Sequence, residues 1–311
     1  MTIYAPFINQ VGNVESYISP TELKFSPTAS ALDLADLVQT GGQAANDLAL
    51  IQLIKRASGM ADAFCYGKMG TLNATINTEN GRYNTDRLGR VKIHPKYTPI
   101  IGISSFEYGQ NAGTLTPLAL TTGNAWIEEE ELVIIPSGSV GTVVYSGTDT
   151  LSNLTQGETS GWGYYCQWSY INGWANTFTT STTVAGSTTM SVVDGTGLYP
   201  GVQTTIFDGM NEEIVTLAST YVAGSSSLVF TSGTLYKHGS NVNVSRIHQN
   251  IKQAVVHLVC SLVKERSQGG GFEISPAGEV IQTSGKSKGF SDDEIQAYNL
   301  LDEFQCISGR T

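Results

Sequence analysis

The 311-residue chain has few charged side chains, because aspartate, glutamate, lysine and arginine together make up only 14% of it. Basic residues are the scarcer kind, with 17 lysines and arginines against 27 acidic residues and a net charge of −10 at pH 7. Tight binding to a nucleic-acid duplex depends on basic side chains that neutralise phosphates, so this balance argues against a protein that reads nucleic-acid sequence. The acidic charge suits ordinary solubility, and also a surface past which nucleic acid moves without sticking.

The sequence also lacks a hydrophobic run long enough to span a membrane, and MTIYAPFINQ at its start lacks the pattern of a signal peptide. We therefore expect no membrane partner and synthesis in the cytoplasm. The four cysteines form no CxxC pair and no metal-binding spacing. Their scarcity indicates a reduced, intracellular site of synthesis.

Motifs of common enzymes are missing too: there is no P-loop, dinucleotide fingerprint, nucleophile elbow or HExxH pair. His238, beside Gly239 in a predicted turn, is interpreted as structural. The acidic run Glu128–Glu131 has the residue type that holds a hard cation or performs acid–base chemistry. Neighbouring side chains of a strand point to opposite faces, however, so a solvated acidic face is favoured. We predict no enzymatic activity, no catalytic residue, no cofactor and no bound metal.

Two segments have the periodicity of long helices. Residues 247–266 repeat apolar side chains every three or four positions, and the second half is apolar almost all round, which predicts neighbours on several sides. The predicted core residues of this helix are Ile251, Val255, Leu258, Val259 and Leu262. Residues 43–65 show the same spacing, so we expect the two helices to bury each other.

Most of the chain between these helices has the character of β-structure. The chain contains 34 glycines, and threonine and serine are abundant, as in short strands joined by turns. Asn172-Gly173 predicts a hairpin on which Trp168, Tyr170 and Trp174 pack in the core or form an aromatic platform for a sugar or a base. Residues 178–245 predict an antiparallel sandwich or small barrel.

The last segment begins with glycine-rich chain and ends in a short amphipathic helix. Ser291 and Glu294 have the spacing of a capping box, and apolar residues follow on one face. Such a helix on a tether suits docking onto a partner, or it folds back onto its own domain.

The predicted fold class is therefore α+β, with a helical core of two long helices plus short helices, β-hairpins, and an inserted antiparallel β sandwich or barrel module. The predicted domains are an extended N-terminal arm (1–30), an adaptor core of helices and strands (31–177 and 246–268), an inserted β module (178–245), and a flexible tether with a C-terminal docking helix (269–311).

The order of these parts resembles that of the tailed-bacteriophage head-to-tail connectors, the adaptors that sit beneath the portal. Residues 1–30 and 108–160 take no part in the resemblance. The family's early helix is similar to ANDLALIQLIKRASGMADAFCYG, and the β segment after it to NGRYNTDRLGRVKIHPKYTPIIGISSFEYG. The family's Tyr-x-x-Gly-aromatic hairpin is similar to SYINGWANTFTT. Its β module inserted before the last core helix is similar to VVDGTGLYPGVQTTIFDGMNEEIVTLAS continuing to LYKHGSNVNVSRIHQNIKQAVVHLVCSLVKER.

The resemblance implies a structural virion protein at the head–tail interface. Its members form a homo-oligomeric ring, usually a dodecamer, with a lumen through which DNA passes without sequence-specific binding. Residues 271–311 would reach the portal protein, and the opposite side would meet a stopper or tail-completion protein. The residues expected to dock onto the portal are Phe290, Ile295, Tyr298, Leu301 and Phe304.

Two other classes stay open. A carbohydrate-binding or adhesion protein would use the aromatic-rich β region, with Trp162, Trp168 and Trp174. A hydrolase would use Glu128–Glu131. A stopper or tail terminator is a further structural alternative, although such proteins are shorter and mostly β.

Overall fold

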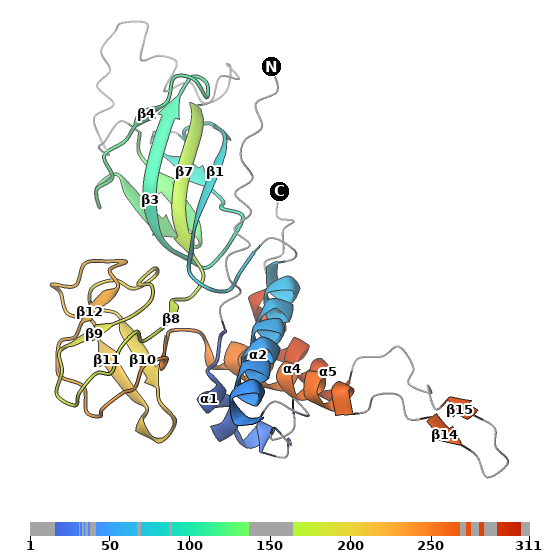
Figure 1. Cartoon of the computed structure of the whole chain (residues 1–311). Coiled ribbons are helices and arrows are strands. Elements are labelled where there is room, and N and C mark those ends of the chain that lie inside the picture. The colour runs from blue at the N-terminus through green and yellow to red at the C-terminus, as the bar shows by residue number, and fades with distance from the viewer. Residues whose placement is uncertain are drawn as a thin grey trace, which may run out of the picture. The chain divides into compact units, whose positions relative to one another are not determined.

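The computed structural model describes residues 16–30, 32, 34, 37, 42–66, 70–86, 89–136, 164–267, 272–274, 280–282 and 291–305. They have an α+β fold that contains helices and several antiparallel sheets (Figure 1). The chain forms two compact units, of which the first comprises Met1–Asn73 with Ala175–Gln305 and the second contains Ala74–Trp174. None of the described helices is both long and apolar enough to cross a membrane.

The second unit consists of two antiparallel sheets. Four strands lie in the order β1-β7-β3-β4, and three lie in the order β2-β6-β5. Apolar side chains from both sheets pack into one core that contains Phe106, Trp168 and Tyr170. The bounds are β1 (Thr75–Tyr83), β2 (Val91–Ile93), β3 (Ile100–Gly109), β4 (Thr116–Pro117), β5 (Ala125–Glu128), β6 (Glu131–Ile134) and β7 (Tyr164–Asn172).

The prediction of a hairpin at Asn172-Gly173 is wrong, because β7 does not pair with the segment that follows it. Strand β7 pairs along its length with β1 on one side and β3 on the other, so it has no free edge for the segment that follows. Gly173 does adopt the expected positive φ, of 91°, but the chain continues into β8 (Asn176–Phe178), which pairs with another strand. Trp168 and Tyr170 are 1% and 0% exposed, which confirms core packing for these two rings.

A different pair of residues forms a two-residue hairpin turn. Glu129 and Glu130 have φ values of 49° and 66° and connect β5 to β6. Two consecutive positive φ values define a type I′ turn, whose twist matches that of the strands it joins. The acidic run is therefore a hairpin tip rather than a continuous strand, because the alternation expected for it stops at the turn.

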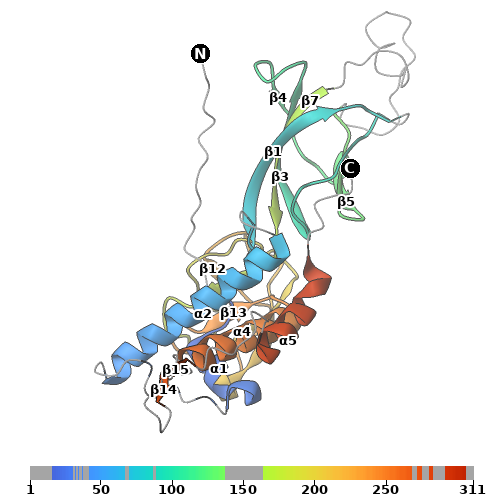
Figure 2. The same ribbon diagram turned by 90° about the vertical axis from the view of Figure 1, so that its right-hand side faces the viewer.

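The first unit contains the helices, which are α1 (Pro20–Phe25), α2 (Gly42–Tyr66), α4 (Gln249–Ser267) and α5 (Asp292–Leu301), with the 3-10 turns η1 (Pro27–Ala29) and η3 (Asp302–Phe304). Helices stand at both positions where the periodicity predicts long ones, and α4 packs against α2 and α5 (Figure 2). The predicted residues Ile251, Val255, Leu258 and Val259 are all 0% exposed, and Leu262 is half-buried.

Residues 16–30 differ from the extended arm expected for this segment. Ser19 and Glu22 form a capping box at the start of α1, and Pro20 occupies the first helical position. Tyr17, Ile18 and Leu23 are 1%, 0% and 0% exposed. The polar composition of residues 1–30 does not indicate this helix, although Ser-x-x-Glu is the signature of its N-terminus. Residues 1–15 of the predicted arm lie outside the described residues.

The remaining strands of the first unit form two further antiparallel sheets and a short pair. The four-stranded sheet has the order β11-β10-β13-β8, and β9 pairs with β12. They share an apolar core that contains Ile206, Leu228 and Val244. Inside the predicted tether, β14 pairs with β15. The bounds are β9 (Thr189–Ser191), β10 (Gln203–Phe207), β11 (Glu213–Thr216), β12 (Ser227–Val229), β13 (Asn243–Ser245), β14 (Phe272–Ile274) and β15 (Val280–Gln282), with the 3-10 turn η2 (Gly209–Asn211).

Candidate functional site

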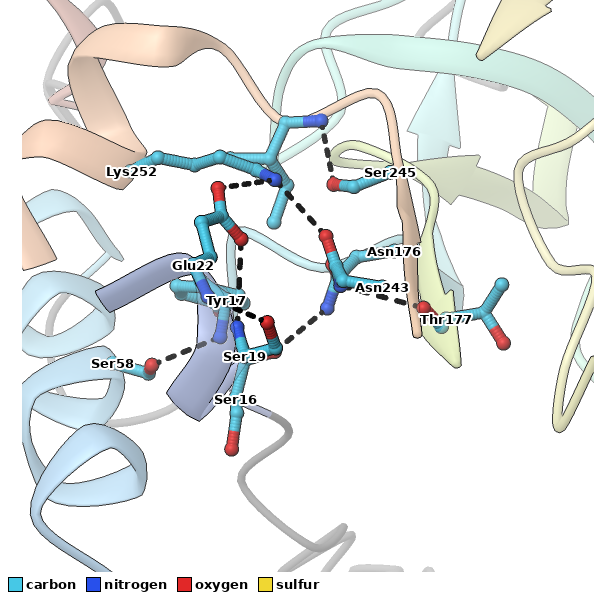
Figure 3. Close-up of polar contacts among 11 residues, drawn as sticks. Ser16, Tyr17, Ser19, Glu22, Ser58, Asn176, Thr177, Asn243, Ser245 and Lys252 are labelled. Carbon is cyan, nitrogen blue, oxygen red and sulfur yellow. Dashed lines mark hydrogen bonds and ion pairs between the residues drawn. The ribbon is translucent and has the colours of Figure 1, made fainter. Parts of the chain in front are cut away.

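A lysine side chain lies almost completely buried where α1, α4 and β13 meet (Figure 3). Lys252 is 2% exposed, and its Nζ donates to Glu22 Oε1 at 3.0 Å and to Asn243 Oδ1 at 2.9 Å. The same Nζ lies 3.1 Å from the centre of the Phe207 ring. An amine, a carboxyl group, an amide and an aromatic face thus share one water-poor site.

Local structure holds each polar partner of the lysine in place. The capping box of α1 fixes the Glu22 carboxyl group, because Oε2 accepts from the Ser19 N–H at 3.4 Å while Oε1 faces Lys252. Asn243 lies in β13, and its Nδ2 donates to Asn176 Oδ1 at 2.8 Å and to the Thr177 carbonyl at 3.3 Å. These bonds leave the Asn243 oxygen pointing at the lysine.

Burial shifts both titratable groups of this site toward their neutral forms. It lowers the pKa of Lys252 to about 8, although the attraction of Glu22 opposes the shift. It also raises the pKa of Glu22, with Lys252 opposing. A buried ion pair that joins α4 to α1 is the structural interpretation of this arrangement. The chemical interpretation is an activated amine, since desolvation of a lysine favours its nucleophilic form.

A second buried polar network lies between α2 and the segment before α1. The Tyr17 hydroxyl donates to the Asp62 carboxylate and lies 2.9 Å from Thr71 Oγ1, while the Leu72 N–H donates to Asp62 at 2.7 Å. Burial raises the pKa of Asp62 to about 6, and these hydrogen bonds only partly oppose it. The polar groups of this network bond to one another, so its role is to hold the N-terminal segment against α2.

His238 is fully buried between two carboxylates. Its Nε2 lies 2.6 Å from Glu213 Oε1 and its Nδ1 lies 3.1 Å from Asp208 Oδ2. The other Glu213 oxygen accepts from the Leu235 N–H at 2.7 Å. Both ring nitrogens are engaged, which agrees with the structural role expected for this histidine. The sequence carries no signal for the pairing, because the partners stand 30 and 25 residues away.

The residues expected to dock onto a partner are divided by the structure. Leu301 is 0% exposed and Phe304 is half-buried, with its ring centre 5.3 Å from that of His248. Ile295 is 46% exposed, and Tyr298 is half-buried and stacks on Phe64 at 4.7 Å. Phe290 lies outside the described residues. Only part of this set is thus available at the surface.

An open apolar groove runs between α2 and α5. It encloses about 520 Å³ and is lined by Met60, Ala63, Phe64, Ile295, Tyr298 and Asn299. Helix α5 is held against α4 by the contact of the Ser261 and Ser291 hydroxyl groups at 2.8 Å and by the ion pair of Lys264 with Asp293 at 2.6 Å. Residues of α2 and α5, two helices that are distant in the sequence, therefore form one surface of the first unit.

In the second unit the acidic run forms the tip of the β5–β6 hairpin, with Glu128 paired opposite Glu131. Glu131 lies 3.6 Å from Lys92 and 3.4 Å from His94, and Glu128, Glu129 and Glu130 are exposed. Within the described ranges no group of three or more histidine, cysteine, aspartate or glutamate side chains is arranged to hold a metal ion.

Comparisons with protein-family models, with curated proteins and with solved structures found no match.

Proposed function

We propose that this chain is a structural virion protein of the phage neck, a ring-forming adaptor that joins the portal to the stopper or tail-completion protein. The observation that carries the proposal is the order of its parts. A long helix is followed by a β segment, a second β region leads directly into a second long helix, and a short capped helix follows near the end of the chain. This is the order that the resemblance to connector proteins rests on.

The finer description of the fold belongs to the same proposal. We propose that α2 and α4 form the helical core and that residues 178–245 are a β sandwich inserted before α4. Two antiparallel sheets with a shared apolar core in this segment support the description. The sheets belong to the same compact unit as the helices, as a module anchored on that core would.

Exposed apolar side chains on the first unit support assembly with other chains. Burying such side chains between subunits would remove apolar surface from water, which favours association. The proposed ring would bury part of them, and the α2–α5 groove would face the portal. The most exposed examples are Val184 (65%), Met210 (86%), Ile214 (68%), Val222 (72%) and Leu235 (73%).

The charge of the chain fits a passage for DNA. A ring whose subunits carry a net charge of −10 repels phosphate, so that DNA moves through the lumen without binding to it. The proposed site of action is the head–tail interface of the virion. No catalytic step is needed for this role, which depends on repeated protein interfaces alone.

Negative-stain electron microscopy of the purified protein, alone and mixed with portal-bearing particles, tests the proposal. Rings, or a new layer of density beneath the portal, are the expected result. Monomers that never join a portal would contradict it and would favour the carbohydrate-binding alternative. That alternative has lost one of its candidate rings, because Trp168 is buried in the core. A glycan array is the next measurement in that case.

A further inference from the structure

The buried site around Lys252 holds the three groups that form an amide bond between side chains. The amine is the nucleophile, the side-chain amide of Asn243 is the acceptor, and the Glu22 carboxyl group touches the amine. From this geometry we infer that Lys252 and Asn243 become joined by an intramolecular isopeptide bond after the chain has folded.

The nucleophile and the acceptor are already in contact. Lys252 Nζ lies 2.9 Å from Asn243 Oδ1, which is bonded to the carbon that the amine would attack. Reacting groups held together by a folded protein react as if at very high concentration. Asn243 is 0% exposed and Lys252 2%, so both side chains have few alternative positions and little water competes with the amine.

The amide of Asn243 is oriented for this attack. The Lys252 Nζ donates to Oδ1 of Asn243, so the amide oxygen is the end of the amide that lies beside the amine. The opposite end of the amide donates to Asn176 Oδ1 and to the Thr177 carbonyl. The nitrogen that would leave is therefore directed away from the amine, toward two acceptors that stabilise the ammonia formed from it.

Glu22 is placed to move the proton. Its Oε1 is 3.0 Å from Lys252 Nζ, and Ser19 holds its other oxygen. Burial favours the neutral amine and the neutral carboxylic acid together, since it lowers the pKa of Lys252 and raises that of Glu22. The Phe207 ring, 3.1 Å from Nζ, keeps this side of the site free of polar groups.

The proposed step is balanced without any co-reactant. The neutral Lys252 amine attacks Cγ of Asn243, a C–N bond forms, and the electron pair of the C=O bond moves to Oδ1. Glu22 takes a proton from the attacking nitrogen, and Nδ2, which is then bound to the same carbon as that nitrogen, gains one. The Cγ–Nδ2 bond then breaks, the carbonyl re-forms, and ammonia leaves. The product is a secondary amide that ties strand β13 to helix α4.

The mass of the intact, denatured protein tests this inference directly. Loss of one ammonia makes the chain about 17 Da lighter than its sequence. Trypsin would then yield residues 238–246 linked to residues 247–264, with no cleavage after Lys252. The full sequence mass with a free 247–252 peptide would overturn the inference, and so would a gain of about 1 Da from simple deamidation of Asn243.

Variants separate the bond from the fold around it. Lys252→Arg and Asn243→Ala are expected to keep the full mass, whereas the control Lys264→Arg, on the exposed part of the same helix, loses ammonia as the wild type does. Glu22→Gln is expected to fold, by circular dichroism, and to keep the full mass. A folded Glu22→Gln protein that is still about 17 Da lighter would overturn the role assigned to Glu22.

Discussion

Individual buried carboxyl groups couple the stability of this protein to pH. Asp62 is 9% exposed and receives hydrogen bonds from Tyr17 and Leu72, yet burial raises its pKa to about 6 from an ordinary 3.8. The folded chain therefore holds a proton on Asp62 at pH values where the unfolded chain has released it. Stability from this group is complete below about pH 4 and is lost as the pH rises through 6.

We expect Asp62→Asn to remove this pH dependence. The wild-type free energy of unfolding should fall by about 2–3 kcal/mol between pH 4 and pH 7 through this residue, and the variant should lack that fall. Urea denaturation at several pH values measures the difference.

The matched control is Asp47→Asn. Lys24 and Gln43 lower the pKa of the exposed Asp47, so its contribution is lost as the pH falls instead. A fall between pH 4 and 7 that is as large in Asp62→Asn as in the wild type would show that another group, such as Glu22, causes it.

At the scale of elements, the central helix α4 depends on apolar neighbours on several sides. Val259 is 0% exposed and lies one turn from Val255 and Val263, which are 0% and 8% exposed. A charge placed there has no partner and no water. We expect Val259→Asp to destabilise the protein by more than about 3 kcal/mol, measured by the loss of helical circular dichroism on heating.

Leu48→Asp is the control for that substitution, because Leu48 on α2 is 63% exposed. Its melting temperature should stay close to that of the wild type. Equal melting temperatures for Val259→Asp and the wild type would contradict the buried position of Val259.

The β5–β6 hairpin offers a stabilising substitution. Glu129 and Glu130 both adopt positive φ, which asparagine and glycine tolerate better than glutamate does. We expect Glu129→Asn with Glu130→Gly to raise the free energy of unfolding by about 1 kcal/mol, measured by urea denaturation. Glu128→Gln, beside the turn, should change stability little. A loss of stability in the double variant would show that the two glutamates make favourable contacts that outweigh their strain.

At the scale of the whole molecule, α5 has one buried and one exposed side. Ala297 and Leu301 are each 0% exposed, whereas Ile295 borders the α2–α5 groove and is 46% exposed. Helix α5 thus folds back onto its own unit and still presents a surface. Assembly and folding are separable at this helix by substitution on either side.

We expect Ile295→Asp to leave the fold intact and to abolish attachment to portal-bearing particles, since it places a charge in the proposed contact surface. Co-sedimentation with such particles measures attachment. Leu301→Asp is the comparison and should instead lower the melting temperature by several degrees. Undiminished co-sedimentation of a folded Ile295→Asp protein would remove α5 from the proposed interface.

Local patterns in the sequence were sufficient for several elements. Apolar spacing predicted α4 and its buried residues, and Ser291 with Glu294 predicted the start of α5, because a helix and its cap are set by residues three or four positions apart. Ser19 and Glu22 carry the same signature, but α1 has only six residues and no apolar periodicity of its own, so the segment resembles an extended arm. The hairpin at Asn172-Gly173 failed because the strand before it was already paired on both edges.

Only the tertiary structure decided which polar residues meet. Lys252 and Glu22 are 230 residues apart, and His238 meets Asp208 and Glu213, which stand 30 and 25 residues before it. Sequence patterns report the local preferences of the backbone, whereas such pairs arise from the way whole elements pack. The sequence by itself therefore determined the positions of α2, α4 and α5, the cap of α5 and an α+β composition. Tertiary packing determined the buried lysine site, because only packing brings Lys252, Glu22 and Asn243 together and removes them from water.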